Sequence, residues 1–524
     1  MWQVSAFSWH TQLLIRPHKF SSGSWGGAPD QFALEKDQSN VGTEQHLKIE
    51  VNDGVITTYF NNSETPSNTA TVDSFALGYV GFRASGSEEY YIDNFKITDG
   101  NGKVILDEDF DDDNIQGFPE TAHKNGRLEI TKASLGNNEI FLRTTDGSET
   151  KAESSPMFRK EFSTDQSKDV ESARLYITSA GLYDAYINGK RVTDSVLNPG
   201  MTAYDDHILY QTYDVTDLVN DGENVIGAYL GHGWFDKALR NFGSKLLLYA
   251  KLLITYTDGS TDVVVTDDSW KFYRYGPILD DDIFNGFKFD GQTAKSLDGW
   301  NNIGFDDTDW DKPALYNANE VVYQNKTPEI IAQNLPLIKN TIKLKALAVT
   351  EPEDGVYIYD FGQNIAGVVR VTATADAGTV MKLRHAEILN RENMKDTSGN
   401  STGKPGTLYT GNLPRADATD TYTFYGDPNG ETFEPFFTYH GFRYLEITGL
   451  DEAPALEDVT ALLIMSDLEQ TSTFTTSDES VNRLYQNALW SAHDNFMSVP
   501  TDCPQRGERF GWTGDAQIFA RTAT

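Results

Sequence analysis

The sequence predicts a mainly β protein, with several β-sandwich or jelly-roll domains in series and a helical segment at its end. Short runs that alternate apolar and polar residues recur until about residue 475, for example at 173–178 and 251–256. This period of two is typical of half-buried strands. Turn pairs such as Asn188-Gly189 separate the runs. After about residue 475 the apolar residues change to helical spacing, which predicts a different kind of element there.

Size and composition limit the class of protein. A chain of 524 residues is too long for one core and suggests about three or four domains. Its net charge of −35 disfavours nucleic acid and anionic membrane surfaces as partners. No apolar run approaches the roughly 18 residues of a membrane span. Cys503 is the only cysteine, so an intrachain disulfide and a thiolate metal cluster are excluded.

Residues 1–135 are expected to form the first sandwich. The segment begins directly on a strand-like run at 2–7 with no lead-in. Two further runs, at 78–83 and 91–96, resemble the concanavalin- and laminin-G-like sandwiches that occur beside glycosidase domains. We therefore expect a sandwich of that kind, truncated at its N-terminus.

Two more all-β domains are expected, at residues 150–312 and 335–467. Both ranges carry strand-like alternation between turn signals, at a spacing typical of sandwiches and jelly rolls. The segments that mark them are Gly181–Arg191, Tyr210–Val215 and Gly231–Phe235 in the first domain, and Asp360–Asn364, Arg384–Glu387 and Tyr439–Tyr444 in the second.

A helix is predicted from about Ser477 to Met497, and it is the only helix that the pattern supports. Ser477 and the two acidic residues after it are typical of a helix start. Five apolar residues then follow at helical spacing: Val481, Leu484, Tyr485, Ala488 and Leu489. Pro500 ends the helix. The helix leads directly into the segment with the most unusual composition.

Residues 501–515 combine carboxylates, arginines and a tryptophan among glycines, a mixture suited to binding a polyol and moving protons. Hydrolysis of a glycosidic bond requires two carboxyl groups, one of them protonated. Glu508 is the candidate acid, because Asp502, Asp515 and Trp512 would surround it with negative charge and apolar surface, which raise a carboxyl pKa.

The other polar groups of this segment suit a sugar. Asp502 and Asp515 would accept hydrogen bonds from its hydroxyl groups, and Arg506 would hold a carboxylate in place. Trp512 would face the apolar side of a deoxysugar. The alternative is a purely structural network, in which Arg506 and Arg509 pair with Asp502 and Glu508.

The segment 498–515 resembles the signature of bacterial α-L-rhamnosidases of glycoside hydrolase family 78. The likeness extends over nearly everything from about residue 155, in the family's order of domains. It is carried by Ala180–Tyr183, Tyr210–Val215, Asp360–Asn364, Arg384–Glu387, Ala418–Tyr422 and Tyr439–Tyr444. The resemblance implies that 150–312 is the family's N-terminal jelly roll, that 335–467 is its sandwich, and that 475–524 begins a truncated (α/α)6 catalytic barrel.

The resemblance also implies roles for individual residues. Glu508 matches the general acid, and Asp502, Arg506, Trp512 and Asp515 match positions that bind the rhamnose. One departure is Gly507, where the family commonly has an acidic residue.

Family members invert configuration with a second glutamate far downstream on the barrel. That base is not in this chain, so we expect a segment of a longer enzyme that is inactive alone.

The jelly roll further resembles a calcium-dependent rhamnose-binding module, with Asn241, Asp281 and Asp282 as candidate ligands. Ordinary loop polarity explains these residues equally well, and the expected catalysis requires no cofactor. The rival function is a non-catalytic protein that binds carbohydrate through its sandwiches. In either case the expected partner is a rhamnose-containing glycan or glycoside, and the expected location is secreted or cell-surface, with a cytoplasmic one left open.

Overall fold

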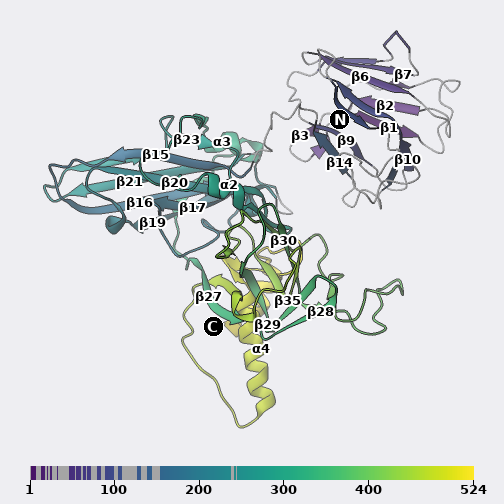
Figure 1. The fold of residues 1–524 in the computed structure, drawn as a ribbon. Helices are drawn as coiled ribbons and strands as arrows, with labels where there is room; N and C mark the ends of the chain where they lie inside the picture. The colour runs from purple at the N-terminus through teal and green to yellow at the C-terminus, as the bar shows by residue number, and fades with distance from the viewer. Residues whose placement is uncertain are drawn as a thin grey trace. The chain divides into compact units, whose positions relative to one another are not determined.

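The chain divides into two compact units, Met1–Lys151 and Ala152–Thr524 (Figure 1). The computed structural model describes residues 154–523 except 238–240 and 244; before residue 154 it describes the strands and a few short stretches beside them. Both units are built mainly from β-strands, which confirms the predicted fold class. No helix among the described residues is long and apolar enough to cross a membrane.

In the residues of the first unit that the structure describes, the strands form two three-stranded antiparallel sheets and four strand pairs. The first sheet joins β1 (Trp2–Ala6), β2 (Leu13–Pro17) and β5 (Phe32–Ala33), and the second joins β6 (Leu47–Asn52), β7 (Val55–Phe60) and β8 (Asn68–Thr71). The pairs are β3 (Phe20–Ser21) with β4 (Ser24–Trp25), β9 (Tyr79–Arg83) with β14 (Glu139–Arg143), β10 (Glu89–Ile92) with β13 (Leu128–Thr131), and β11 (Phe95–Thr98) with β12 (Val104–Glu108). The laminin-G-like assignment of residues 1–135 stays a prediction.

The second unit begins with a sandwich of two five-stranded sheets. In spatial order, one sheet holds β18 (Lys190–Arg191), β17 (Leu182–Ile187), β20 (Glu223–Gly231), β15 (Met157–Ser163) and β23 (Lys271–Tyr273). The other holds β22 (Thr261–Val265), β21 (Leu247–Tyr256), β16 (Val170–Ala180), β19 (His207–Asp214) and β26 (Glu329–Ala332). The predicted turn between β17 and β18 is present, with positive φ angles of 50° at Asn188 and 78° at Gly189.

A ten-stranded sheet follows. Its main path is β24 (Ile278–Asp282), β25 (Gly286–Asp290), β33 (Thr419–Thr423), β30 (Val380–Ala386), β35 (His440–Thr448), β29 (Val356–Ala373), β36 (Val459–Ser466) and β27 (Ile338–Lys345), while β28 (Ala348–Glu353) and β34 (Glu431–Phe433) pair with β29. Another short pair is β31 (Ile388–Leu389) with β32 (Leu408–Tyr409). Although β24 and β25 precede residue 312, β25 pairs in parallel with β33, so the hydrogen-bonded sheets cross the expected domain boundary.

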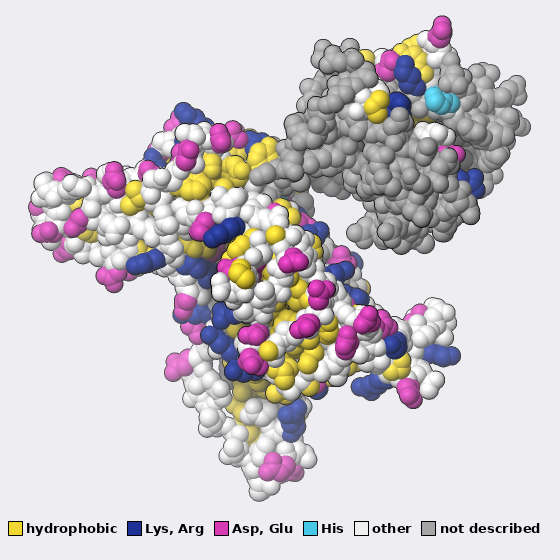
Figure 2. All heavy atoms as spheres, viewed as in Figure 1, with side chains coloured by type: hydrophobic (Ala, Val, Ile, Leu, Met, Phe, Trp, Pro, Cys, Tyr) yellow, Lys and Arg dark blue, Asp and Glu magenta, His cyan; other side chains and the backbone are white. Residues whose placement is uncertain are grey.

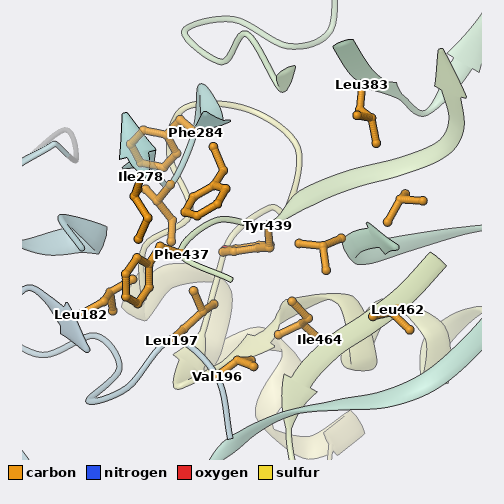
Figure 3. Close-up of a cluster of buried hydrophobic side chains, with 14 of the residues drawn as sticks. Leu182, Val196, Leu197, Ile278, Phe284, Leu383, Phe437, Tyr439, Leu462 and Ile464 are labelled. Carbon is orange, nitrogen blue, oxygen red and sulfur yellow. The ribbon is translucent and has the colours of Figure 1, made fainter. Parts of the chain in front are cut away.

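One apolar core runs through both parts of the second unit (Figure 3). Leu182 and Val196 come from the first sandwich, and Leu383 and Leu462 from the ten-stranded sheet, yet all four belong to the same cluster of buried side chains. Phe284 and Tyr439 lie in this cluster as well. The first sandwich and the ten-stranded sheet therefore share one continuous hydrophobic core.

The predicted helix is confirmed as α4 (Glu479–Asn495), where the side chain of Asp478 accepts a hydrogen bond from the Ser480 N–H at 2.8 Å. The prediction of a single helix is wrong, because α5 (Thr513–Ala523) follows it. Several shorter helical turns carry no readable periodicity: α1 (Gly233–Asp236), α2 (Gly291–Ser296), α3 (Ala318–Val321), η2 (Thr216–Leu218), η3 (Tyr323–Asn325) and η4 (Leu456–Asp458).

The acidic side chains are distributed over the second unit. On the face shown in Figure 2, Asp and Glu are spread among Lys and Arg instead of gathering in one patch. This distribution fits a charge that keeps the protein soluble.

Candidate active site

A short hairpin after α4 fixes the start of the 501–515 segment. The hairpin pairs β37 (Phe496–Met497) with β38 (Val499–Pro500) and turns at Ser498, where φ is +67°. The Ser498 N–H donates to Ser466 Oγ at 3.0 Å, and Ser498 Oγ accepts from the Met201 N–H at 3.1 Å. The segment is therefore tied to both sandwiches before its functional residues begin.

Arg509 anchors the middle of the 501–515 segment to the strands on which it packs. Its side chain is completely buried, and its backbone adopts a φ of +55°. Its guanidinium donates to four backbone carbonyl groups, those of Gln505, Arg506, Ile283 and Tyr439. Burial lowers the pKa of Arg509, so these contacts are needed to hold the charge. Arg509 thus bonds to carbonyl groups, whereas the structural alternative had paired it with Asp502 or Glu508.

Aromatic rings and a glycine complete this anchorage. The Arg509 guanidinium lies 4.8 Å from the ring centre of Tyr439 and 5.3 Å from that of Phe284. The Trp234 Nε1–H donates to the Arg509 carbonyl at 3.1 Å. A Cβ on Gly441 would lie only 2.7 Å from the Gln505 Cβ, so the segment packs directly on the start of β35. The position of Glu508 is therefore set by the sandwiches.

Arg506 joins the two carboxylates that precede and follow it. Its Nε donates to Glu508 Oε2 at 2.9 Å, and its Nη2 donates to Asp502 Oδ2 at 3.1 Å. The other oxygen of Asp502 accepts the Phe510 N–H at 3.0 Å, which closes the loop between the two residues. This half of the predicted ion-pair network is present.

All five residues predicted to act on a sugar line one open hollow of about 420 Å³. Its walls are Asp502, Arg506, Glu508, Trp512, Gly514 and Asp515. Trp512 is 47% exposed, and Asp515 lies in the first turn of α5. The hollow therefore offers carboxylates, a guanidinium and an aromatic face to one ligand, the set of groups that sugar binding uses.

The expected pKa of Glu508 is not what the structure gives. The hydrogen bond from Arg506 lowers the pKa of Glu508, because it stabilises the charged form of the carboxyl group. The prediction from neighbouring acids alone is wrong, since it did not place the guanidinium in direct contact with this carboxylate. An acid role for Glu508 requires that Arg506 release it.

Gly507, the departure from the family pattern, lies at a close contact. Its N–H donates to the Pro414 carbonyl at 3.0 Å. A Cβ at this position would collide with the carbonyl oxygen of Arg415. The glycine therefore lets the loop around Arg415 approach the acid.

A buried cluster below the segment was not assigned a role from the sequence. His440 Nε2 lies 3.0 Å from Asp420 Oδ1, and His385 Nε2 lies 3.9 Å from Asp420 Oδ2, with all three side chains fully buried. Each belongs to a segment that carried the family resemblance, which was the only signal available.

This cluster does not fit a metal ion. The two imidazole rings stack with centres 4.2 Å apart and an interplanar angle of 24°, so their lone pairs lie in two separate, nearly parallel planes and an ion between them would lie out of the plane of at least one ring. Burial lowers the pKa of both histidines, to about 3 for His385, where His440 adds to the shift, and the nearby charge of Arg509 lowers both further. A further cation would be unfavourable there.

The candidate calcium ligands have other partners. Asp281 accepts hydrogen bonds from the Ser155 hydroxyl and, at 2.6 Å, from the His232 N–H. Asp282 accepts from Phe284 and Asn285 N–H groups and from the Asn285 side chain, at 2.8, 2.9 and 3.0 Å. The Asn241 side chain accepts from the Gly243 N–H at 3.1 Å. These contacts do not fit a calcium site built from the three residues, because donors already point at their oxygens.

The same succession of domains is found in a known protein family. Three family models match in succession: the α-L-rhamnosidase N-terminal domain over 168–339, the bacterial α-L-rhamnosidase concanavalin-like domain over 350–465, and the six-hairpin glycosidase domain of the same proteins over 469–524. From residue 168 onward the chain belongs to the bacterial α-L-rhamnosidases, glycoside hydrolase family 78.

Individual relatives agree with this assignment. An α-L-rhamnosidase of Streptomyces avermitilis is 41% identical over 362 residues, which cover 68% of this chain and 33% of that protein. The solved structure of the Dictyoglomus thermophilum α-L-rhamnosidase has a TM-score of 0.63 and 37% identity, over 74% of this chain and 40% of that one. A Streptomyces avermitilis α-L-rhamnosidase solved with L-rhamnose has a TM-score of 0.66 and 32% identity, over 85% and 47%. The chain spans about a third of the length of the curated relatives it matches.

Proposed function

We propose that the protein containing this chain hydrolyses terminal α-L-rhamnosyl residues of glycans or glycosides with inversion of configuration. The observation that carries the proposal is the single hollow lined by Asp502, Arg506, Glu508, Trp512 and Asp515. A relative solved with L-rhamnose supports the choice of sugar. The expected location is outside the cell, where such polymers are met.

In the proposed reaction Glu508 donates its proton to the glycosidic oxygen as the bond from that oxygen to the anomeric carbon breaks. A water molecule attacks the anomeric carbon from the opposite face and loses its proton to a carboxylate base. We expect that base on the catalytic barrel that the family resemblance implies. Asp502 and Asp515 accept hydrogen bonds from the sugar hydroxyls, and Trp512 faces its apolar side.

Arg506 provides a way to protonate Glu508 at the right stage. When a bound sugar displaces the Arg506 contact, Glu508 remains beside Asp502, whose oxygen lies within 4.8 Å of it. Loss of the Arg506 hydrogen bond and exclusion of water both raise the pKa of this carboxyl group. The pKa of Glu508 then rises only when substrate is present. No calcium ion takes part in this proposal.

The proposal is tested with Glu508→Gln in the full-length protein. Rhamnose release from a natural glycoside should fall about 10²–10⁴-fold in kcat, the usual contribution of a general acid. Release from a dinitrophenyl rhamnoside should fall much less, because that leaving group needs no proton. The exposed Glu392→Gln serves as the matched control. Near-normal turnover of the natural glycoside by Glu508→Gln would refute the acid assignment.

A non-catalytic function is the second candidate for these 524 residues taken alone. The same hollow would bind rhamnose, but a base supplied from downstream would be missing. We expect the isolated chain to bind L-rhamnose without releasing it from glycosides. Measurable hydrolysis by the 524-residue chain would contradict this expectation and place the base within it.

A further inference from the structure

Three arginines lie close to Glu508, and two of them are fully engaged. Arg506 donates to two carboxylates, and Arg509 donates to four carbonyl groups. The third, Arg415, is exposed, and in the part of the chain that the structure describes no hydrogen bond or ion pair ties its guanidinium to another residue. An arginine with free donors beside a reactive carboxyl is available to a ligand.

The loop that carries Arg415 is seated firmly on the acid segment. The neighbouring Pro414 carbonyl accepts the Gly507 N–H at 3.0 Å, and the Arg415 carbonyl takes the space where a side chain of residue 507 would begin. Leu413 and Ala416 on either side are buried. Arg415 itself adopts a φ of +62°, a conformation that such residues keep only where the surroundings hold it.

The side on which Arg415 lies follows from the residues around Glu508. The positive charge of Arg415 acts on Glu508, since it contributes to the lowered pKa of that carboxyl after the larger effect of Arg506. Arg415 is nevertheless absent from the walls of the hollow, which include Trp512 and Asp515. A charge that acts on the acid from outside the hollow assigned to the sugar is suited to the other side of the scissile bond, where the leaving group lies.

We propose that Arg415 binds an anionic group on the leaving-group side of the scissile bond, so that the protein prefers rhamnosides whose aglycone or adjoining sugar carries a carboxylate. This inference rests on the proposed function. A guanidinium presents paired N–H donors that match the two oxygens of a carboxylate.

The overall charge does not oppose this preference at contact. A net charge of −35 repels anions at long range. At physiological ionic strength that repulsion is screened beyond roughly 8 Å, whereas a direct guanidinium–carboxylate contact is not. Selectivity should therefore appear at physiological salt, and added salt should weaken it only gradually.

The test compares two probes that differ in one charge, 4-carboxyphenyl and 4-carbamoylphenyl α-L-rhamnoside. The ratio of their kcat/KM values is measured in the full-length protein before and after Arg415→Gln. The two leaving groups differ in intrinsic reactivity, but that difference is the same in both proteins. It therefore cancels when the ratio of the variant is compared with the ratio of the unaltered protein. We expect Arg415→Gln to lower the carboxylate-to-amide ratio roughly fivefold, the scale of a partly exposed charged contact.

Arg483→Gln on α4 changes the net charge equally and should leave the ratio unchanged. Calorimetric titration of both probes into the 524-residue chain should show the same selectivity in binding, without any turnover. If both probes are hydrolysed but Arg415→Gln leaves the ratio as it was, the inference is overturned and the proposed function stands. If neither probe is hydrolysed or bound, both are refuted.

Discussion

Arg506 controls the charge of the candidate acid. Its guanidinium contacts Glu508 at 2.9 Å and Asp502 at 3.1 Å, so its single positive charge is shared between two carboxylates that line the same hollow. A protonated Glu508 cannot accept this contact as favourably as a charged one. The residue that organises the hollow without ligand is therefore also the residue whose displacement prepares the acid.

Arg506→Gln is expected to move the basic limb of the pH–rate profile of the full-length protein to higher pH. The general acid must be protonated, so activity falls as the pH rises through its pKa. Arg506 lowers the pKa of Glu508, and removing the guanidinium raises it. The measurement is kcat/KM against pH, which reports the free enzyme. A basic limb that stays in place or moves to lower pH would contradict the role assigned to Arg506.

At the scale of elements, α4 leads into the 501–515 segment, and the C-terminal turn of α4 is the part that is buried. Asp494 in its last turn is 7% exposed, and its Oδ1 accepts the Ala366 N–H of β29 at 2.8 Å. At the other end Leu484 is 67% exposed and Val481 39%, although their spacing predicts a buried face. The contact between Asp494 and β29 is thus central to how α4 is held.

The stability that Asp494 contributes should therefore fall as the pH rises from about 4 to about 7. Burial raises the pKa of Asp494 to about 7, and the charge of Glu387 adds to this shift. A carboxyl group whose pKa is about 3.9 when unfolded favours the folded protein while protonated, and this contribution is lost as the pH rises through the folded pKa. The slope is at most about 1.4 kcal/mol per pH unit.

Asp494→Asn tests this dependence, because an amide oxygen keeps the contact with Ala366 and cannot ionise. Urea unfolding at pH 5 and pH 8 should show a smaller loss of stability in the variant than in the unaltered protein. The exposed Asp354→Asn should behave like the unaltered protein. Equal pH dependence in all three would show that Asp494 does not titrate as described.

At the scale of the whole molecule, the 501–515 segment depends on both the first sandwich and the ten-stranded sheet of the second unit. Met201 and Trp234 of the first sandwich contact Ser498 and Arg509, and Tyr439 of the ten-stranded sheet contacts Arg509. One buried cluster joins these regions. The hollow is therefore a property of the unit Ala152–Thr524 as a whole.

A chain that begins at Ala152 is expected to fold by itself and to bind L-rhamnose as tightly as the 524-residue chain. The reason is that the core shared by its sheets, and the residues that line the hollow, lie after that residue. Thermal unfolding and calorimetric titration of both chains measure this directly. A lower Tm for the shorter chain, or weaker binding of the sugar, would show that residues 1–151 support the site.

The sequence by itself determined the fold class, the position of α4 and the five residues of the hollow. These follow from local information, because strand and helix periodicity and the 501–515 composition are written in neighbouring residues. Asn188 and Gly189 likewise fixed their turn through their own backbone preferences.

Only the tertiary structure decided the direction of the pKa shift of Glu508 and the contacts that fix its position. The contact from Arg506 reversed the pKa expected for Glu508, and the parallel pairing of β25 with β33 joined segments more than a hundred residues apart. Arg509 found its partners in the carbonyl groups of distant strands. Packing in three dimensions determines which groups become partners, and burial determines the free-energy cost of each charge. A pattern of adjacent residues holds neither kind of information.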